Sequence, residues 1–274
     1  MCLVIFAYQT CPGYPLVLAA NRDEFHARET ASSRFWTEHP EILAGRDLKA
    51  GGTWMGITRA GRFAAITNYR DPPGSFDAPR SRGELPLDFL IGDCSPQAYL
   101  HGVAPRAQEY AGFNLLLGDI NGLWYYSNRP CAPGDIPPPP LMLQPGVYGL
   151  SNASLDTPWP KVELGKQQLA QALTKRPLQH GELLSVVHDR QQASAEALNL
   201  QGMESEMEQL LSAQFILAGD YGTRSTTTMW VEDSGNVSWR ELGFTRQGGV
   251  GETSEEDFQL SISKLRTDPL DSTA

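Results

Sequence analysis

A cysteine stands at position two, directly before an apolar run that is rich in β-branched residues. Free cysteine packs well as a small hydrophobe, so Cys2 can simply belong to a buried first strand. A small penultimate residue also permits removal of the initiator methionine, which would leave a thiol and an α-amine on one residue. These first residues leave both interpretations open.

Charged side chains follow the second apolar run, in the segment AANRDEFHARET. The runs at 2–8 and 15–21 flank a Pro-Gly turn and are predicted to form a β-hairpin. The end of the second strand then returns beside the start of the first, which places Arg22 and Asp23 near Cys2. A cation lowers the pKa of a nearby thiol, and a carboxylate can orient an amine. The alternative is a solvated loop with an ordinary surface ion pair.

Three further polar residues stand where apolar segments end or begin, namely Asn68, Asn152 and Arg224. Each is a weak signal alone, because asparagine at a strand end is most often a turn former or a helix cap.

Other kinds of chemistry find little support. The five histidines form no HxxxH pair and do not flank a cysteine pair, so no metal site and no cofactor is expected. A GxSxG elbow is absent, which argues against a serine nucleophile. Neither GxGxxG nor GxxxxGK[ST] occurs, which disfavours a doubly wound nucleotide-binding sheet.

The charge and composition of the chain limit the classes of partner that it can bind. The chain has 274 residues, a net charge of −10 and 41% hydrophobic residues, which is typical of a globular protein with a sizeable core. Such an acidic surface repels phosphate backbones, so nucleic acid is not expected as a partner. No secretory leader or membrane span is visible. The four cysteines are few and widely spread, as in reduced cytoplasmic proteins. The oligomeric state stays open.

The order of elements predicts an α+β protein with antiparallel sheets covered by helices. Turn residues between apolar runs predict three more hairpins, and helical patterns lie between them. The hairpins are expected at 51–69, 113–128 and 223–244, and the helices at 95–111, 158–175, 181–190 and 204–213. One domain is expected over residues 1–253, followed by a polar, frayed tail at 254–274.

The segments MCLVIFAY, AANRDEF, GGTWMGIT, TNYRDP, YGLSNASLDTPWPKV and YGTRSTT occur in this order. Together they resemble the NRDE-motif family, also called the transport and Golgi organisation family, whose four letters stand here at 21–24. That family is similar to N-terminal-nucleophile (Ntn) cysteine hydrolases of the choloylglycine and penicillin V acylase type. The resemblance implies a four-layer αββα sandwich in which removal of the preceding residue exposes the cysteine.

The resemblance also implies roles for the charged and amide residues. Cys2 would attack a carbonyl carbon while its own α-amine carries the proton, Arg22 would favour the thiolate and Asp23 would position the amine. The acylase relatives separate their arginine and aspartate by two residues, whereas here the two are adjacent. Either Asp23 or Glu24 could therefore take the amine-orienting place.

For the remaining residues the resemblance implies contacts with substrate. The side-chain N–H of Asn152 and a donor from the segment at Asn68 would face the developing oxyanion. Arg224 would complete the charge network or hold an anionic substrate group. Three aromatic side chains would line an apolar substrate pocket: Trp54, Tyr69 and Trp159.

Two functions follow from this resemblance, and the residues do not decide between them. The first is hydrolysis or acyl transfer on a C–N amide of a small, partly apolar substrate by Cys2. The second is a non-enzymatic carrier or trafficking protein for a hydrophobic ligand, such as haem or a lipid-like acyl compound, on the same scaffold. A third interpretation leaves Cys2 as a core residue and the charges as structural.

Overall fold

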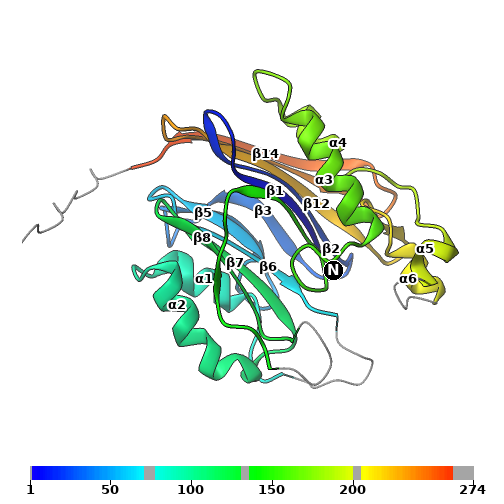
Figure 1. Cartoon of the computed structure of the whole chain (residues 1–274), viewed down its shortest axis with the longest axis horizontal. Helices are drawn as coiled ribbons and strands as arrows, with labels where there is room; N and C mark the ends of the chain where they lie inside the picture. Colours follow the sequence, from blue (N-terminus) through cyan, green and yellow to red (C-terminus); the bar gives the residue numbers. More distant parts are fainter. Residues whose placement is uncertain (1, 71–77, 131–135, 200–204, 262–274) are drawn as a thin grey trace, which may run out of the picture.

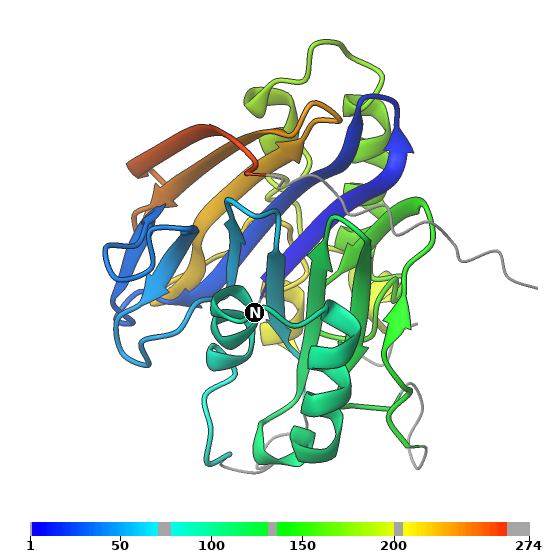
Figure 2. The ribbon, with the colours of Figure 1, turned by 90° about the vertical axis from the view of Figure 1, so that its left-hand side faces the viewer.

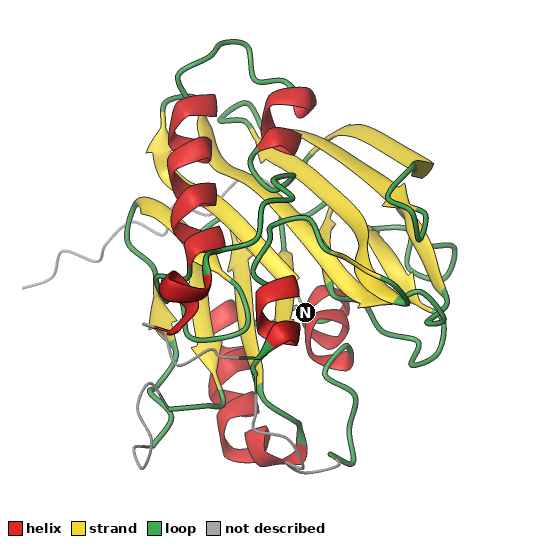
Figure 3. Cartoon of the chain, turned by 90° about the vertical axis from the view of Figure 1, so that its right-hand side faces the viewer, coloured by secondary structure: helices red, strands yellow, loops and turns green. Residues whose placement is uncertain are grey.

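The computed structural model describes residues 2–70, 78–130, 136–199 and 205–261. Two antiparallel sheets lie face to face, and helices cover the outer face of each (Figure 1). The expected αββα layering is confirmed, and the same order of layers can be followed in the side views of Figures 2 and 3.

The first sheet carries the N-terminal hairpin at its centre. Its order is β10-β1-β2-β12-β13-β14, with the short β11 paired to β12. The strands are β1 (Cys2–Cys11), β2 (Tyr14–Phe25), β10 (Gly146–Leu150), β11 (Leu217–Ala218), β12 (Tyr221–Val231), β13 (Asn236–Phe244) and β14 (Val250–Gln259).

The second sheet is a meander in chain order, β3-β4-β5-β6-β7-β8-β9. The strands are β3 (Thr30–Phe35), β4 (Ile42–Asp47), β5 (Met55–Thr58), β6 (Phe63–Asn68), β7 (Phe113–Asp119), β8 (Gly122–Ser127) and β9 (Leu141–Met142).

Helices pack on each sheet according to where they occur in the chain. Helices α1 (Glu84–Ile91) and α2 (Pro96–Val103) contact the second sheet, and a 3-10 turn (Ala104–Glu109) follows α2. The first sheet is contacted by α3 (Pro160–Ala172) and α4 (His180–Ser185). Two short helices follow, α5 (Ala195–Asn199) and α6 (Glu206–Leu210).

Strand β1 is buried on both faces, which explains its continuous apolar sequence. Cys2, Val4 and Phe6 belong to the core between the two sheets. The alternate residues Leu3 and Ile5 belong to the core under α3 and α4. A strand that lies between two layers needs apolar side chains at every position. Cys2, Val4 and Phe6 form the row of β1 side chains that faces the second sheet, here called the inter-sheet row, and Cys2 stands at its end.

All four predicted hairpins are confirmed, as β1–β2, β5–β6, β7–β8 and β12–β13. The helix expected at 95–111 begins with a Ser95 cap that accepts a hydrogen bond from the Ala98 N–H at 3.2 Å. It then gives way to the 3-10 turn at Pro105. The tail prediction needs correction, because residues 254–259 pair with β13 as part of β14. The rest of that tail, from residue 262, lies outside the described residues.

A buried histidine between α4 and the first sheet leads to a pH prediction. His180 contacts the hydroxyls of Thr228 and Ser238 and stacks on Trp230. Burial, with the positive charge of Arg240 nearby, lowers its pKa to about 4 from an ordinary value near 6.5. The folded protein thus holds this ring neutral, and the associated stability is present above pH 6.5 and is lost as the pH falls toward 4.

We expect the free energy of unfolding to fall by about 2–3 kcal/mol through this residue between pH 6.5 and 4. Urea unfolding of a His180→Phe variant should show this fraction of the pH dependence removed, although the variant is less stable at every pH. The exposed His101 provides the control as His101→Phe. Parallel stability curves for His180→Phe and the wild type would contradict the assignment.

Candidate active site

Cys2 is the first residue of β1, and its neighbours on the adjacent strands are polar. The strand register pairs Cys2 with Arg22 on β2 and Arg22 with Ser225 on β12. Directly paired residues of antiparallel strands lie on the same face of the sheet. Cys2 and Arg22 therefore share the inter-sheet face, as the hairpin predicts.

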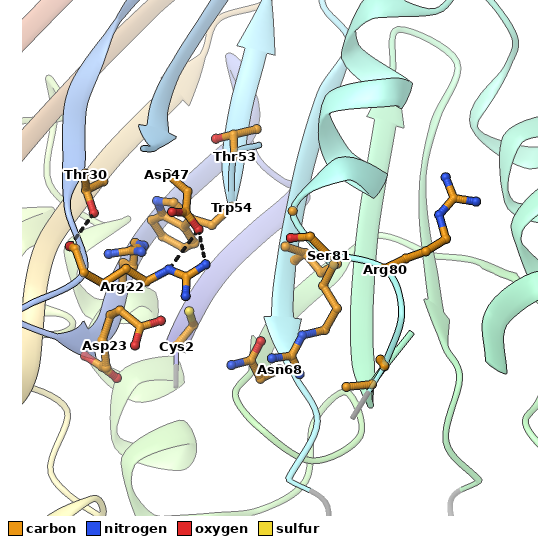
Figure 4. A pocket seen from close by; sticks show the side chains of 17 residues that line it. Cys2, Arg22, Asp23, Thr30, Asp47, Thr53, Trp54, Asn68, Arg80 and Ser81 are labelled. Atoms are coloured by element: carbon orange, nitrogen blue, oxygen red, sulfur yellow. Dashed lines mark hydrogen bonds and ion pairs between the residues drawn. The ribbon is translucent and has the colours of Figure 1, made fainter. Parts of the chain in front are cut away.

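A cavity of about 310 Å³ opens at this end of the sandwich. One wall comes from the ends of β1 and β2, with Cys2, Arg22 and Asp23, and the other comes from Asn68 and the segment 80–83. Figure 4 shows the sulfur of Cys2 facing the space between these walls. Besides these residues, the lining is Glu24, Arg28, Thr30, Asp47, Thr53, Trp54, Ile66, Ala78 and Ala111. Charged and polar groups thus dominate this lining.

The main chain of Cys2 is held by the segment that follows β10. The Cys2 N–H donates to Asn152 Oδ1 at 3.4 Å, and the Ser151 hydroxyl donates to the Cys2 carbonyl at 2.9 Å. Asn152 Nδ2 donates to the Asn68 carbonyl at 2.7 Å. Since a carbonyl can only accept, this last bond fixes which end of the Asn152 amide faces Cys2.

The amide of Asn152 holds the main chain of Cys2. It presents its oxygen to the Cys2 nitrogen, and one of its two N–H groups is bonded to the Asn68 backbone. The expected donation to an oxyanion stays a prediction for the second N–H group. The Asn68 side chain lines the cavity, so it faces the space where a substrate would lie.

Of the two adjacent carboxylates, Asp23 is the buried one. Its Oδ1 accepts a hydrogen bond from Thr223 Oγ1 at 2.8 Å, and burial raises its pKa. Glu24 is partly exposed and accepts from the neighbouring Phe25 N–H at 2.9 Å. Both carboxylates line the cavity. Asp23 is thus the buried carboxylate of the two, and its charge acts on the Cys2 thiol.

The surroundings of the Cys2 thiol shift its pKa in opposite directions. Burial raises the pKa of Cys2 most strongly, and the Asp23 carboxylate raises it further. The Arg22 guanidinium and a hydrogen bond from the Asp23 backbone N–H lower it, as expected for a cation beside a thiol. The net direction is upward, so the thiol needs a base at close range to lose its proton near neutral pH.

A buried lysine near Asp23 was not anticipated from the sequence. Lys161 is 4% exposed in the first turn of α3, and its Nζ donates to the Leu211 carbonyl at 2.9 Å. Burial lowers its pKa, whereas the charges of Asp23 and Cys2 raise it. One signal could have revealed it: a cation in the first turn of a helix opposes the helix dipole, so its presence needs a reason.

Arg224 braces the turn between β2 and β3. It is the extra residue of a β-bulge, because Thr223 pairs with Asp23 while Ser225 pairs with Arg22. Its Nη1 lies 2.9, 3.3 and 3.0 Å from the carbonyls of Phe25, His26 and Arg28. Arg224 thereby holds in place the loop that brings Arg28 to the cavity.

The three predicted aromatic residues are not grouped. Trp54 lines the cavity at Cys2, whereas Tyr69 and Trp159 are absent from its described lining. Trp159 borders a separate, small cavity beside Lys161. Tyr69 directly follows β6 and donates its backbone N–H to the Gly112 carbonyl at 2.8 Å.

The described ranges offer neither a cluster of metal ligands nor a helix that could span a membrane. They contain no group of three or more His, Cys, Asp or Glu side chains placed to hold a metal ion. Within the same ranges, every helix is too short or too polar to cross a membrane.

Two solved structures have a similar fold at low sequence identity. One is the Caenorhabditis elegans ortholog of N-acylethanolamine-hydrolyzing acid amidase, with a TM-score of 0.49, 10% identity, and coverage of 84% of this chain and 92% of that chain. The other is the C2A mutant of conjugated bile acid hydrolase from Clostridium perfringens. Its TM-score is 0.44 and its identity 11%, over 97% of this chain and 100% of that chain.

Sequence relatives match over most of the chain. The Transport and Golgi organization protein 2 homolog of Bos taurus is 37% identical over 95% of this chain and 99% of its own length. The human homolog is 39% identical over 88% of this chain and 92% of its own. The Drosophila melanogaster protein is 31% identical over 74% of this chain and 71% of its own. The model of the family Transport and Golgi organisation 2 matches residues 1–246, so the chain belongs to that family.

Proposed function

We propose that this protein is an Ntn-type cysteine hydrolase or acyltransferase that acts on a C–N amide of a small substrate. The main observation that supports this proposal is that Cys2 lines a cavity beside Arg22, while its nitrogen donates to Asn152 Oδ1. Nucleophile and base would then belong to the same residue. The proposal requires that Met1 is removed in the mature protein.

The free α-amine of Cys2 would take the proton from its own thiol. An α-amine has an ordinary pKa of about 7.7–8.0, which suits a base near neutral pH. Asn152 Oδ1 would accept one N–H of this amine, and the buried Asp23 would strengthen its basicity through its negative charge. Arg22 would stabilise the thiolate that results.

The thiolate would attack the carbonyl carbon, and the electron pair of the C=O bond would move to oxygen. The Asn68 side chain, on the opposite wall, would donate to that oxyanion. Collapse would break the C–N bond, and the α-amine would return its proton to the leaving nitrogen. A thioester on Cys2 would remain, to be cleaved by water in a hydrolase or by an amine in an acyltransferase.

The mature N-terminus and the order of thiol labelling test this proposal. Intact mass of the native protein should show that Met1 is absent. Iodoacetamide should alkylate Cys2 before the buried Cys11, and this preference should fall when the α-amine is protonated. The exposed Cys94 serves as the internal reference for an ordinary thiol. Retained methionine, or a Cys2 that reacts no faster than Cys11, would reject the proposal.

A carrier role is the second candidate, and a different cavity favours it. At the far end of the sandwich lies an apolar cavity of about 220 Å³, lined by Leu16, Phe63, Leu123 and Val231 among others. Tyr8 borders it, six residues along β1 from Cys2 and hence about 20 Å away. A cavity of this size is smaller than usual ligand pockets, so it suits a short apolar group better than a haem. Binding of such a ligand by a Cys2→Ser variant with wild-type affinity would support this role.

A further inference from the structure

A second chamber lies beside the Cys2 cavity, on the other side of Arg22. It measures about 190 Å³ and shares Arg22, Thr30 and Trp54 with the first cavity. Its other walls come from β12, β13 and the start of β14, and they include Arg224 and Glu241. The two cavities therefore adjoin at Arg22, Thr30 and Trp54.

Two guanidinium groups of this chamber lack acceptors for some of their N–H groups. Arg22 is 7% exposed, and its Nη1 is buried without an acceptor among the described residues. The same holds for the Nε of Arg224 within the described part of the chain. Buried N–H groups of a charged side chain are costly to leave unbonded, so an acceptor is expected at this place. By contrast, Arg28 in the first cavity is paired with Asp47 at 2.5 Å.

Neither guanidinium of this pair forms a direct ion pair among the described residues. Burial, and then the charge of Arg22, lower the pKa of the Arg224 guanidinium, so the two cations lie within electrostatic reach. Glu241 also lines the chamber, but its oxygens accept from the Ser33 N–H at 2.7 Å and the Thr227 hydroxyl at 3.3 Å. Burial raises the pKa of Glu241, while hydrogen bonds from Ser33 and Thr227 and the nearby charge of Arg22 lower it.

The other carboxylate of the chamber is Glu252. It is exposed and accepts from the Ser32 hydroxyl at 2.6 Å. Neither carboxylate therefore forms a direct ion pair with Arg22 or Arg224 within the described residues. The chamber thus holds two guanidinium groups with buried N–H groups that have no acceptor among the described residues.

We infer that the chamber binds a carboxylate between Arg22 and Arg224, and that the substrate is a small amide with a carboxylate remote from the scissile bond. The inference rests on the proposed function for the position of the scissile amide at Cys2. Arginine is well suited to this task, because its planar group can bind a carboxylate through two parallel hydrogen bonds. A chamber of this size accommodates a carboxylate with a few carbon atoms.

A matched pair of alkylating reagents tests the charge preference without any turnover. N-iodoacetylglycine carries a carboxylate, and N-iodoacetylglycinamide replaces it by a neutral amide of the same shape. Peptide mass spectrometry gives the alkylation rate of Cys2 relative to that of the exposed Cys94 in the same sample. We expect the anionic reagent to be preferred at Cys2 by about tenfold, which corresponds to ~1.4 kcal/mol. Equal preference at Cys2 and Cys94 would overturn the inference.

Three variants locate the source of the preference. Arg224→Gln should bring the preference of Cys2 close to that of Cys94, and Arg224→Lys should retain part of it. Arg246→Gln is the matched control, because Arg246 is an exposed partner of Asp220 and its loss changes the net charge equally. An Arg224→Gln protein that melts like the wild type and keeps the full preference would overturn the assignment.

A ligand-induced change in melting temperature separates this inference from the proposed function. N-acetylglycine should raise the melting temperature of the wild type more than N-acetylglycinamide at equal concentration, because ligand binding stabilises the folded state. An Arg224→Gln variant that fails to fold would leave this measurement intact. If the two compounds raise the melting temperature equally, the carboxylate site is rejected, even if neutral amides are hydrolysed. If the shift in melting temperature depends on the carboxylate but Cys2 is unreactive, the proposed hydrolase function is rejected instead.

Discussion

Replacing Cys2 by alanine should lower the hydrolysis of small N-acyl amides by about 10³-fold or more. Loss of a covalent nucleophile removes the pathway itself, and such losses are among the largest single-residue effects in enzymes. The variant should fold normally, because alanine retains the apolar end of the inter-sheet row. Release of amine from a panel of N-acyl amino acids, followed at pH 7.5, gives the comparison of kcat/KM.

Two other cysteines supply the controls. Cys94→Ala removes an exposed thiol and Cys11→Ala removes a buried one that lies 2.7 Å from Arg176, far along β1 from Cys2. Both should keep kcat/KM within about twofold of the wild type, while Cys11→Ala costs some stability. Activity that survives Cys2→Ala would show that another group carries the reaction. It would also favour the carrier role over the hydrolase role.

Asn21→Ala should lower the free energy of unfolding by about 3–5 kcal/mol, although Asn21 lies outside the Cys2 cavity. Its fully buried amide donates to the carbonyls of Val187 at 2.7 Å and Gln214 at 2.9 Å. Its oxygen accepts from the Thr226 hydroxyl at 2.5 Å. Alanine leaves both carbonyls buried without a donor, at a cost of about 1–3 kcal/mol each. The first letter of the NRDE motif thus ties the segment after α4 to the first sheet.

Urea unfolding followed by tryptophan fluorescence measures this loss. Asn21→Asp keeps the acceptor for Thr226 and removes the two donors, so it should be destabilised as well. The exposed Asn236, which contacts Glu232, is the control, and Asn236→Ala should change stability by no more than about 0.5 kcal/mol. A loss below 1 kcal/mol for Asn21→Ala would mean that water replaces the amide.

The hairpins could be predicted because their determinants are local. Alternating apolar runs and turn residues specify which strands pair, and the turn then specifies the register. The neighbourhood of Cys2 and Arg22 follows from such a hairpin, because the two residues stand at its open end. The fold class followed in the same way, from the order of strands and helices. These conclusions needed no contact between distant parts of the chain.

The remaining parts of the site depend on contacts between distant segments. Asn152 meets Cys2 across 150 positions, and the direction of its amide is decided by the Asn68 carbonyl, which no local pattern reveals. The same is true of Lys161, whose helix packs on the first sheet near Asp23.

The sequence alone predicted the four hairpins, a mixture of antiparallel sheets and helices, and a cysteine beside an arginine, and its family resemblance added the four-layer order. Only the tertiary structure decided which polar groups face one another, which carboxylate is buried, and that a second chamber adjoins the Cys2 cavity at Arg22. The physical reason is that turn and strand preferences act over a few residues. Burial and hydrogen bonding of polar groups, by contrast, depend on every layer that packs around them.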